Sequence, residues 1–413
     1  MKSIKDLPIS PDKYDVEILE ELPSNVYEYS LMGGENRKFI NGLIRLLHPK
    51  RILELGVAYG GGTSIILNAI KDFSDCSLIS VDKMLTQDKA ANDHSTSGIC
   101  ETGFIAKEIF SEFYQNGKAK LFTGCDVSNI IDSFNEKFDF VVLDTAHIHP
   151  IETLNFLTVL PHLTDDAVIV VDDVMLHFES FTPTYATRIL YSAVVADKLM
   201  PDGEDYISQN VVTFQITKDT HKYIDNVFSS LMLPWHMFTD DIDGVEQCIE
   251  KNYDPKHLKS FRLARRYNQE LLLHQFRGLR NEWFENTFNY LYNKSQKFAY
   301  VNLIERIKNK FAPIENKDIY FYGGGSCCKG TIELLKSTGL SSFLPKAIYD
   351  RNFERTKEVD GIKTIAPNFS KIDDNAFIIV TLRDMNAAET IVNQIKAEGF
   401  NNIGKIQDFE IFV

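Results

Sequence analysis

Along the first half of the chain, short apolar runs alternate with longer segments in which apolar and polar residues mix. Each of the first five runs ends at or beside an acidic residue, and a short run that is apolar throughout is typical of a strand buried on both faces of a parallel sheet. The mixed segments predict helices, so the order of elements predicts an α/β fold. The predicted strands are Arg51–Leu55, Cys76–Asp82, Lys120–Asp126, Phe138–Asp144, Ala167–Asp173 and a closing strand, Asn210–Ile216.

The last part of the chain repeats this pattern on a smaller scale. The strand Asp318–Gly323 leads into a glycine-rich turn and a helix, and the strands Lys346–Asp350 and Ala376–Thr381 follow. With 413 residues, the chain is long enough for two domains. We predict an α/β domain over residues 1–220, a helical connector over 221–312 and a smaller α/β domain over 313–413.

A glycine-rich turn follows the first strand, between Glu54 and Ser64. Gly56 and the run Gly60–Gly62 allow the backbone to turn sharply and to approach a ligand, which the free N–H groups of the next helix would face. The turn has no G-x-x-x-x-G-K-[ST] pattern, which a phosphate-binding loop would show. The carboxylate of Glu54 just before the turn suits a ligand with hydroxyl or ammonium groups better than it suits a pyrophosphate.

Carboxylates gather at one edge of the predicted sheet. Ligands of open parallel sheets bind outside the carboxyl ends of the strands, so consecutive strands that each bring an acid to this edge predict a binding site there. A single acid after a strand is often only the cap of the next helix, but a series in order is hard to explain in that way. The acids are Glu54, Asp82, Asp126, Asp144 and the pair Asp172 and Asp173.

The segment that carries Glu54, Gly56 and Gly60 resembles motif I of the class I S-adenosylmethionine-dependent methyltransferases. The likeness is strongest to the branch that contains catechol O-methyltransferase and bacterial sugar and macrolide O-methyltransferases. In that branch the turn often reads E-x-G-x-x-x-G-x-S. Here Gly62 stands at the serine position, and the hydroxyl follows at Thr63.

The resemblance covers roughly residues 25–216 and implies a Rossmann-like fold with S-adenosylmethionine as cofactor. It implies that the glycine-rich turn holds the methionine part, that Asp82 meets the ribose hydroxyls and that Asp126 meets the adenine amino group. The cofactor-binding residues that it implies are Glu54, Gly56, Gly60, Gly61, Thr63, Asp82, Asp126 and Asp144.

Asp144, Asp172 and Asp173 resemble the metal ligands of the catechol-type enzymes, which are an Asp after the fourth strand and an Asp-Asn pair after the fifth. Asp173 replaces the Asn and keeps an oxygen ligand. Carboxylate oxygens are hard ligands that suit Mg²⁺ or a similar divalent cation. The alternative is that Asp172 or Asp173 caps the next element and binds no metal.

His147 lies three residues after Asp144, where related bacterial families often show D-x-x-H. With an ordinary pKa near 6.5, a histidine can accept a hydroxyl proton at neutral pH, so His147 and Asp144 are the candidate catalytic residues. A bound metal would assist by lowering the pKa of a substrate oxygen. His147 as a structural hydrogen-bonding residue of the loop is the alternative.

The composition of the chain limits the kinds of partner and the cellular compartment that we expect for the protein. The net charge of −14 argues against nonspecific nucleic-acid binding and against an anionic membrane surface. No apolar run is long enough to span a bilayer, and the N-terminus has no signal-like apolar region. The six cysteines show no C-x-x-C spacing, so we expect free thiols and a cytoplasmic protein.

Two further expectations are a lid in the polar segment 84–103 and core or dimer packing by the aromatic residues from Trp283 to Tyr292.

The last domain, with its turn Gly323–Ser326, resembles Rossmann-like domains of sugar-modifying enzymes. This likeness implies a nucleotide or nucleotide-sugar ligand there, with Asp350 at a ribose hydroxyl. It also implies a sugar or a sugar-bearing small molecule as the methyl acceptor. The predicted function is O-methylation of a small-molecule hydroxyl, and a homo-oligomer stays open.

Three alternatives remain at the sequence level. A metal-independent methyltransferase acting on nitrogen or carbon would need the cofactor residues but not the aspartate cluster. An NAD-type oxidoreductase would carry a G-x-G-x-x-G turn, which neither glycine-rich turn has. A non-catalytic nucleotide-binding protein would not need the acidic edge or His147.

Overall fold

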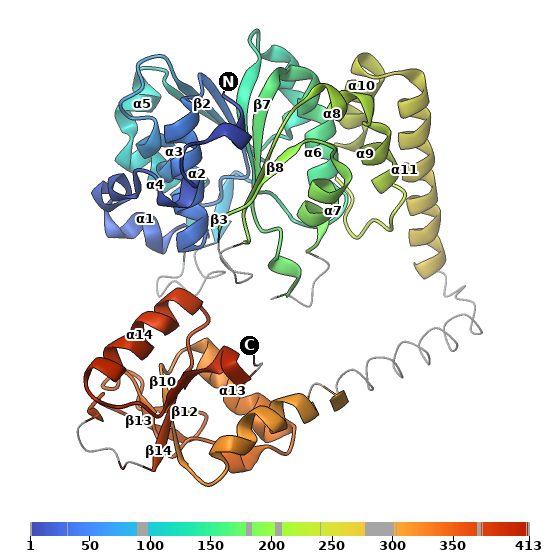
Figure 1. The fold of residues 1–413 in the computed structure, drawn as a ribbon. Helices are drawn as coiled ribbons and strands as arrows, with labels where there is room; N and C mark the ends of the chain where they lie inside the picture. The colour runs from blue at the N-terminus through green and yellow to red at the C-terminus, as the bar shows by residue number, and fades with distance from the viewer. Residues whose placement is uncertain are drawn as a thin grey trace. The chain divides into compact units, whose positions relative to one another are not determined.

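The computed structural model describes two compact units, Met1–Gly278 and Leu279–Val413 (Figure 1). The centre of the predicted lid and the aromatic residues from Trp283 to Tyr292 lie outside the described residues. The residues that are not described are 1, 31, 89–97, 179–183, 203–208, 240, 277–300, 303, 370–372, 374, 410, 412 and 413, together with the side chains of 271–276.

A seven-stranded sheet forms the centre of the first unit and confirms the predicted α/β fold. Neighbouring strands are parallel from β5 to β7, and the last two pairs are antiparallel. The predicted strands all form, because apolar runs of this kind are stable only when both of their faces are covered. Across the sheet the strands are β5 (Ala119–Thr123), β2 (Ser77–Asp82), β1 (Arg51–Leu55), β6 (Phe138–Leu143), β7 (Leu163–Val171), β9 (Val212–Gln215) and β8 (Asp197–Leu199).

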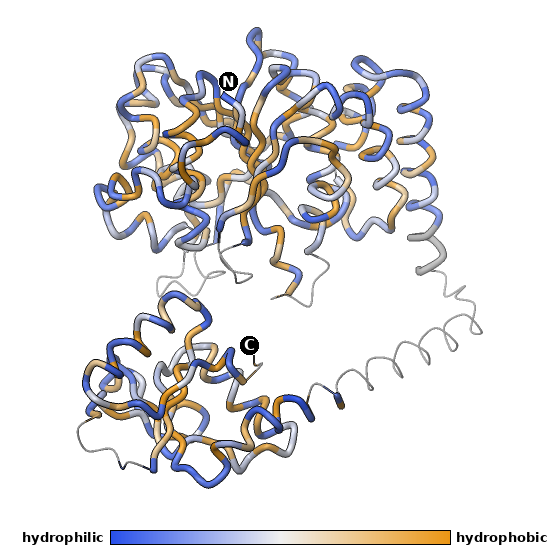
Figure 2. Tube along the Cα trace, in the orientation of Figure 1, coloured by the Kyte–Doolittle hydropathy of each residue, from blue (hydrophilic) through white to orange (hydrophobic). Residues whose placement is uncertain are grey.

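Each face of this sheet has its own core. Ile52 and Val142 pack on one face, whereas their neighbours Leu53 and Val141 pack on the other, as the alternation of side chains along a strand requires. Figure 2 shows the strands between the helices as mostly hydrophobic. The first face is covered by α2 (Gly34–Leu47) and α3 (Gly61–Ala69), and the second by α6 (Ile151–Val159) and α7 (Ala186–Ala193).

Helices that follow the sheet in sequence complete the core on the side of α6. Phe228, Ile249 and Phe261 are buried there in one cluster with Leu157. These residues come from the region predicted as a connector, 221–312, and its described helices up to α11 therefore pack as part of the first unit. The helices are α8 (Lys218–Lys222), α9 (Asp225–Ser230), α10 (Ile242–Asn252) and α11 (Pro255–Phe276).

Short elements surround the first sheet. An antiparallel pair, β3 (Thr86–Asp88) and β4 (Ile99–Glu101), follows β2. The remaining helices are α1 (Ser24–Glu28), α4 (Phe104–Ile109) and α5 (Ser111–Gln115), and the 3₁₀ helices are η1 (Ile4–Asp6), η2 (Pro11–Lys13), η3 (Val16–Glu21), η5 (Val127–Asn129), η6 (Ile131–Ser133), η7 (Leu160–His162) and η8 (Leu176–Phe178).

The second unit contains a six-stranded sheet in the order β12-β13-β11-β10-β14-β15. All neighbouring pairs are parallel except β12 with β13. Its elements are β10 (Asp318–Tyr322), β11 (Ile348–Tyr349), β12 (Glu358–Val359), β13 (Ile362–Ile365), β14 (Ala376–Val380), β15 (Ile403–Lys405), α13 (Ser326–Ser337), α14 (Met385–Ala397), η9 (Ala312–Ile314), η10 (Ser341–Phe343) and η12 (Ile406–Phe409).

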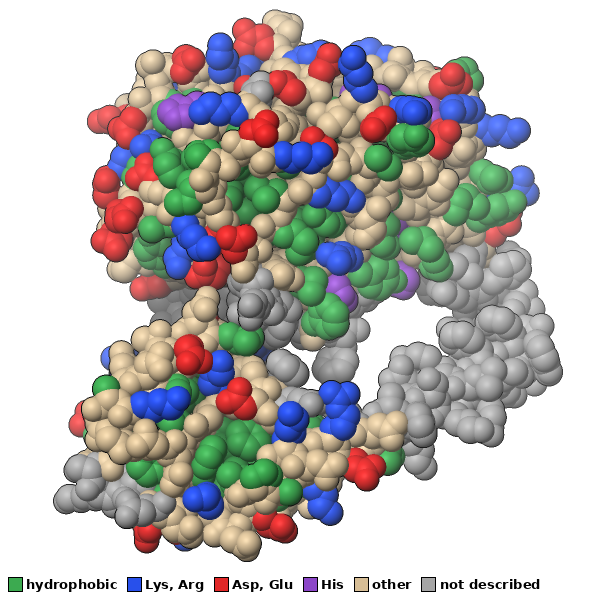
Figure 3. All heavy atoms as spheres, viewed as in Figure 1, with side chains coloured by type: hydrophobic (Ala, Val, Ile, Leu, Met, Phe, Trp, Pro, Cys, Tyr) green, Lys and Arg blue, Asp and Glu red, His purple; other side chains and the backbone are tan. Residues whose placement is uncertain are grey.

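On the face of the first unit seen in Figure 3, Asp and Glu side chains are interspersed with Lys and Arg. All six cysteines are free thiols. Among the described helices, none combines the length and the apolar character that crossing a bilayer requires.

Candidate cofactor and metal site

The glycine-rich turn after β1 lies tightly against the loop that follows β6. Gly56 has a φ of +90°, and a Cβ built on it would lie 1.7 Å from the carbonyl oxygen of Asp144. A Cβ on Gly61 would lie 2.5 Å from the backbone of Ser30. Both positions require glycine because any side chain would collide with backbone atoms. Gly60 precedes α3 and caps it.

Glu54 lies beneath this turn and is 2% exposed. Its carboxylate accepts hydrogen bonds from Thr63 Oγ1, at 3.0 and 2.9 Å, and from Ser80 Oγ at 2.6 Å. Burial raises the pKa of Glu54 to about 8, although the two hydroxyl hydrogen bonds act in the opposite direction. Thr63 is itself buried and directed at Glu54, so the structure places it as a support for the carboxylate and not on a cavity wall.

Asp82, at the end of β2, fixes the shape of the turn. Its Oδ2 accepts hydrogen bonds from the backbone N–H groups of Val57 at 2.8 Å and Ala58 at 3.0 Å. Its Oδ1 accepts one from the N–H of Met84 at 2.7 Å. Asp82 also lines the larger cavity of this edge, so the same residue shapes the turn and faces the space for a ligand.

Asp126 caps η5, just after β5. Its Oδ1 accepts hydrogen bonds from the backbone N–H of Ser128 at 3.1 Å and from Ser128 Oγ at 2.9 Å. Its Oδ2 accepts a longer one, 3.4 Å, from Thr239 Oγ1. Asp126 and Thr239 both line the larger cavity.

Two cavities open at this edge of the sheet. The larger has a volume of about 330 Å³ and includes Asp82 and Asp126 in its wall. The smaller has a volume of about 120 Å³ and includes Glu54 and His147. The walls of the two share residues of the turn and of the loop after β6, so the two cavities are neighbours. The shared residues are Gly56, Val57, Ala58, Asp144 and Thr145.

Three side chains converge where β6 and β7 end. The Nε2 atom of His147 lies 3.4 Å from Asp144 Oδ1 and 3.3 Å from Asp173 Oδ2. One possible ligand atom from each residue lies within 4.8 Å of the others, an arrangement that can hold one metal ion. His147 and Asp173 have φ values of +58° and +57°, in the left-handed backbone region that few residues other than glycine adopt, although Asp and His adopt it more often than most.

Glu152, at the start of α6, supports His147. Its buried side chain accepts hydrogen bonds from the backbone N–H of His147 and from Thr145 Oγ1, and Oε1 lies 3.5 Å from His147 Nδ1. Burial lowers the pKa of His147, but the surrounding carboxylates outweigh this effect and raise it to about 10. These carboxylates therefore favour the protonated form of the His147 imidazole. The carboxylates responsible belong to Asp144, Glu152 and Asp173.

The structure does not bring Asp172 into this cluster. Its side chain is 2% exposed, and its Oδ1 accepts a hydrogen bond from Asn36 Nδ2 at 2.6 Å. Burial, followed by the charges of Asp173 and Asp144, raises the pKa of Asp172 well above its ordinary range. Of the predicted metal set Asp144, Asp172 and Asp173, the structure therefore joins two members, and His147 occupies the third place.

Three residues near the two cavities were not predicted from the sequence: Glu152, Met237 and Thr239. An acid in the first turn of a helix is common because it complements the helix dipole, so Glu152 carries no distinctive signal beyond its closeness to His147. Met237 and Thr239 line the larger cavity although they follow the last strand of the sheet in sequence. No local pattern marks them.

Residues 53–174 match the family model Methyltransf_24, described as a methyltransferase domain. The match covers well under half of the 413 residues and extends from β1 to just beyond β7. It includes Glu54, the glycine-rich turn and the cluster of Asp144, His147 and Asp173. The chain thus carries a methyltransferase domain, the enzyme class predicted from its sequence.

Several solved structures are similar to about half of the chain. The O-methyltransferase from Bacillus cereus in complex with SAH is 18% identical, with 48% of this chain and 89% of that chain covered and a TM-score of 0.33. TomG from Streptomyces achromogenes in complex with SAM is 17% identical, with 52% and 91% covered and a TM-score of 0.31. The methyltransferase PaMTH1 from Podospora anserina, bound to SAH, is 15% identical, with 49% and 85% covered and a TM-score of 0.32. Scores of this size add nothing to the domain match. Among curated proteins, no match to the chain was found.

Proposed function

We propose that this protein transfers the methyl group of S-adenosylmethionine to a hydroxyl group of a small molecule, with assistance from a divalent cation such as Mg²⁺. One observation carries the proposal. A cavity large enough for a nucleoside shares its wall with a smaller cavity that contains a buried carboxylate and the acidic cluster. The methyltransferase domain match covers the residues that form most of both walls.

The cofactor would extend across the two cavities. The carboxylate of Glu54 in the smaller cavity suits the ammonium group of the methionine part, and a bound ammonium would favour its ionised form. Asp82 and Asp126 in the larger cavity would meet the ribose hydroxyls and the adenine amino group. The sulfonium would then lie near the residues that both cavities share, next to Asp144.

A divalent cation would be held by Asp144 and Asp173, with His147 beside or among its ligands. The donor set fits this use, because two carboxylates converge on one point and the second nitrogen of His147 faces the buried carboxylate of Glu152, an arrangement common behind metal-bound histidines. A bound cation would lower the pKa of His147 and of an acceptor hydroxyl in contact with it.

The chemical task of the chain itself is alignment and proton removal. The methyl carbon is already activated by the sulfonium, so an acceptor oxygen in line with it needs orientation and a place for its proton. Asp144 and Asp173 would orient the acceptor, and Nε2 of His147 would take up the hydroxyl proton once its own proton has left. Glu152 would hold the imidazole in place through the backbone N–H of His147 and through Nδ1.

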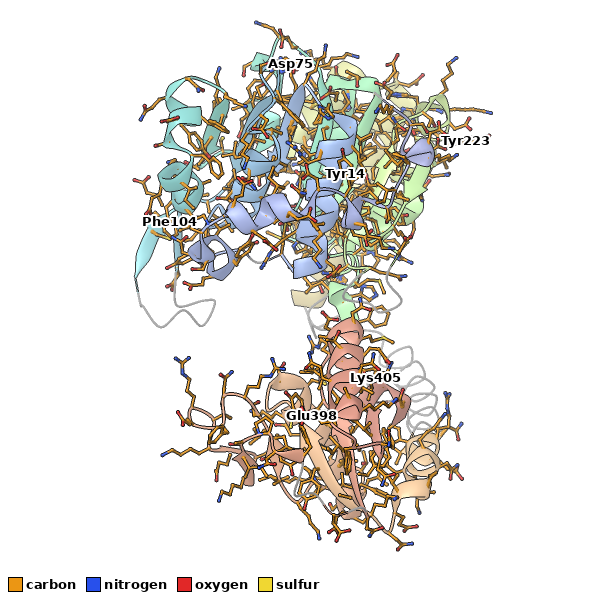
Figure 4. All side chains as sticks on the ribbon, turned by 60° about the vertical axis from the view of Figure 1, so that its left-hand side comes forward. Tyr14, Asp75, Phe104, Tyr223, Glu398 and Lys405 are labelled. Atoms are coloured by element: carbon orange, nitrogen blue, oxygen red, sulfur yellow. The ribbon has the colours of Figure 1, made fainter. Side chains whose placement is uncertain are left out.

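We also propose that the second unit binds a nucleotide or nucleotide-sugar, which would make a sugar-bearing molecule the acceptor. A cavity of about 360 Å³ lies beside Arg351, whose Nε is 3.2 Å from Tyr322 Oη and whose Nη2 is 3.2 Å from Gln394 Oε1. The ring of Phe369 offers a stacking surface, and the guanidinium suits a phosphate. Glu398, labelled in Figure 4 just after α14, completes the wall.

The first test of methyl transfer is calorimetry with S-adenosylhomocysteine, with Mg²⁺ and with a chelator, on the wild type and on Asp144→Ala. Micromolar binding to the wild type, with a Mg²⁺ heat that Asp144→Ala lacks, is the expected result. Cofactor binding with no metal signal would leave a metal-independent methyltransferase acting on nitrogen or carbon. No cofactor binding by the wild type would overturn the proposal.

The second unit is tested by titrating the full chain with UDP and UDP-glucose. Arg351→Ala should abolish the binding, whereas Arg355→Ala, which changes an exposed arginine outside the cavity wall, should leave it unchanged. Equal binding by both variants would place any ligand elsewhere.

A further inference from the structure

One wall of the larger cavity comes from a part of the chain that lies beyond the matched methyltransferase domain. Met237 and Thr239 line this cavity together with Asp126 and Val127. They belong to the segment between α9 and α10, and its described residues 235–239 and 241 are here called the cover segment. Its position over the end of β5 needs an explanation, because a chain that only connected two helices would not have to reach the sheet.

The near end of the cover segment is fixed by buried hydrogen bonds. The backbone N–H of Trp235 donates to Asn268 Oδ1 at 2.7 Å, and its indole N–H donates to the carbonyl of Leu231 at 2.8 Å. The N–H groups of His236 and Met237 donate to the carbonyl of His149 at 3.0 and 3.3 Å. These bonds tie the segment to α11 and to the loop after β6.

The far end is joined to η5, the turn that Asp126 caps. Asp241 Oδ2 accepts hydrogen bonds from Ser128 Oγ and, at 2.7 Å, from Asn129 Nδ2. Thr239, which is 9% exposed, donates its hydroxyl to Asp126 Oδ2 at 3.4 Å. The cover segment and η5 are thus joined at Thr239 and at Asp241.

These contacts bring two acceptor oxygens together in the wall of the larger cavity. Asp126 Oδ1 accepts two hydrogen bonds from Ser128, whereas Asp126 Oδ2 and Thr239 Oγ1 each accept a single long one, 3.4 Å, from Thr239 Oγ1 and from the N–H of Asp241 respectively. Each of these two oxygens therefore has a lone pair with which it can accept from a ligand. Beside them the wall is apolar, with Val127 and Met237. An apolar wall that also offers two hydrogen-bond acceptors suits a flat ring that carries an exocyclic amino group.

We propose that the cover segment is the base-reading wall of the cofactor site, an inference that rests on the proposed cofactor. Met237 packs on the adenine ring, and Thr239, together with Asp126, recognises the adenine amino group. A hypoxanthine ring presents a carbonyl oxygen at that place, which would face a carboxylate without a proton to share. The site should therefore bind S-adenosylhomocysteine more tightly than S-inosylhomocysteine, by a factor of about ten or more.

The test is calorimetry of both ligands with the full-length protein. Met237→Ala should weaken binding of S-adenosylhomocysteine about fivefold through lost ring contact, and Thr239→Val should reduce the preference for the adenine ligand. Matched controls are Met232→Ala, at an exposed methionine outside the cavity wall, and Thr220→Val, at a buried threonine whose hydroxyl donates to the Val195 carbonyl. Both controls should bind like the wild type.

The outcomes separate the inference from the proposed function. If the wild type binds S-adenosylhomocysteine and neither Met237→Ala nor Thr239→Val changes the affinity or the preference for the adenine ligand, the proposed role of the cover segment is overturned. The proposed methyltransferase function would remain. Absence of wild-type binding overturns the proposed function and the inference with it. Thermal unfolding of each variant shows whether a loss of binding reflects misfolding, and Met237→Ala, which removes no hydrogen bond, keeps the inference testable if Thr239→Val unfolds.

Discussion

The carboxyl edges of the two sheets begin alike and end differently. In each, the first strand leads into a glycine-rich turn, and an acid after the neighbouring strand holds that turn through a backbone N–H: Asp82 with Val57 and Ala58, and Asp350 with Gly324. In the first unit the next strands add the cluster of Asp144, His147 and Asp173, whereas in the second the strand β14 is followed by Thr381.

Thr381 closes the second edge instead of adding charge to it. Its hydroxyl donates to the carbonyls of Tyr322 and Gly323, so the residue after β14 seals the turn from the side where the first unit places its acids. The cavity described in the second unit lies beside Arg351 and does not include Gly324 or Asp350 in its wall. A glycine-rich turn held by an acid therefore provides the framework of a site at the edge of the sheet. The residues that follow the later strands determine whether this edge also carries reactive side chains.

We expect the largest effect from replacing a glycine by alanine at matched positions in the two turns. Gly56→Ala places a Cβ 1.7 Å from the Asp144 carbonyl oxygen at a φ of +90°, whereas Gly323→Ala, at a φ of +97°, meets a flexible side chain of Leu382 at 3.0 Å. We expect Gly56→Ala to cost about 3 kcal/mol or more of folding free energy and to abolish cofactor binding, and Gly323→Ala to cost about half as much or less. Urea unfolding and calorimetry measure both. Equal losses would contradict the tighter closure of the first turn.

The acids at the two edges should differ in their affinity for metal. Asp173→Ala removes a member of the cluster, and we expect it to weaken Mn²⁺ or Mg²⁺ binding about 100-fold. Two control variants should leave this affinity unchanged. One is Asp350→Asn in the second unit. The other is Asp172→Asn, because the Asp172 side chain is hydrogen-bonded to Asn36. Calorimetry with the metal alone measures it, and a loss in Asp172→Asn equal to that in Asp173→Ala would restore the metal set predicted from the sequence.

Glu152→Gln should have a smaller effect, because Glu152 touches His147 and no ligand in the proposed mechanism. Removing its charge should lower the pKa of His147, which the carboxylates now raise to about 10, and should reduce the rate of methyl transfer about tenfold. Titration of the His147 imidazole by NMR reports the first effect. Glu112→Gln, at an exposed glutamate, is the control. An unchanged imidazole pKa would remove Glu152 from the site.

The last prediction concerns how the stability of the protein depends on pH. The pKa of Glu54 in the folded protein is about 8, above its ordinary value of 4.5, so the folded state keeps a proton that the unfolded chain has lost between these values. The contribution of Glu54 to the free energy of unfolding therefore falls as the pH rises through this window. Glu54→Gln cannot titrate and should lose less stability from about pH 5 to pH 8 than the wild type. Parallel pH curves from urea unfolding would refute the raised pKa.

Much of the fold and part of the site could be predicted from the sequence. The strands and their terminal acids followed from apolar runs, since a segment without polar residues must be covered on both faces. The places of Glu54, Asp82 and Asp126 at one edge followed from the parallel order of strands. What could not be predicted is which atoms meet: Thr63 donates a hydrogen bond to Glu54, and Asn36 donates one to Asp172.

The sequence by itself determined the two α/β sheets, the tight turn at Gly56 and the acidic edge, because these depend on local patterns of apolar residues, glycine and charge. Only the tertiary structure decided that His147 joins Asp144 and Asp173, that Glu152 lies behind His147, and that Met237 reaches the larger cavity of the first unit. These features depend on the left-handed backbone at His147 and Asp173 and on contacts between residues far apart in sequence. Neither leaves a periodic signal in the chain.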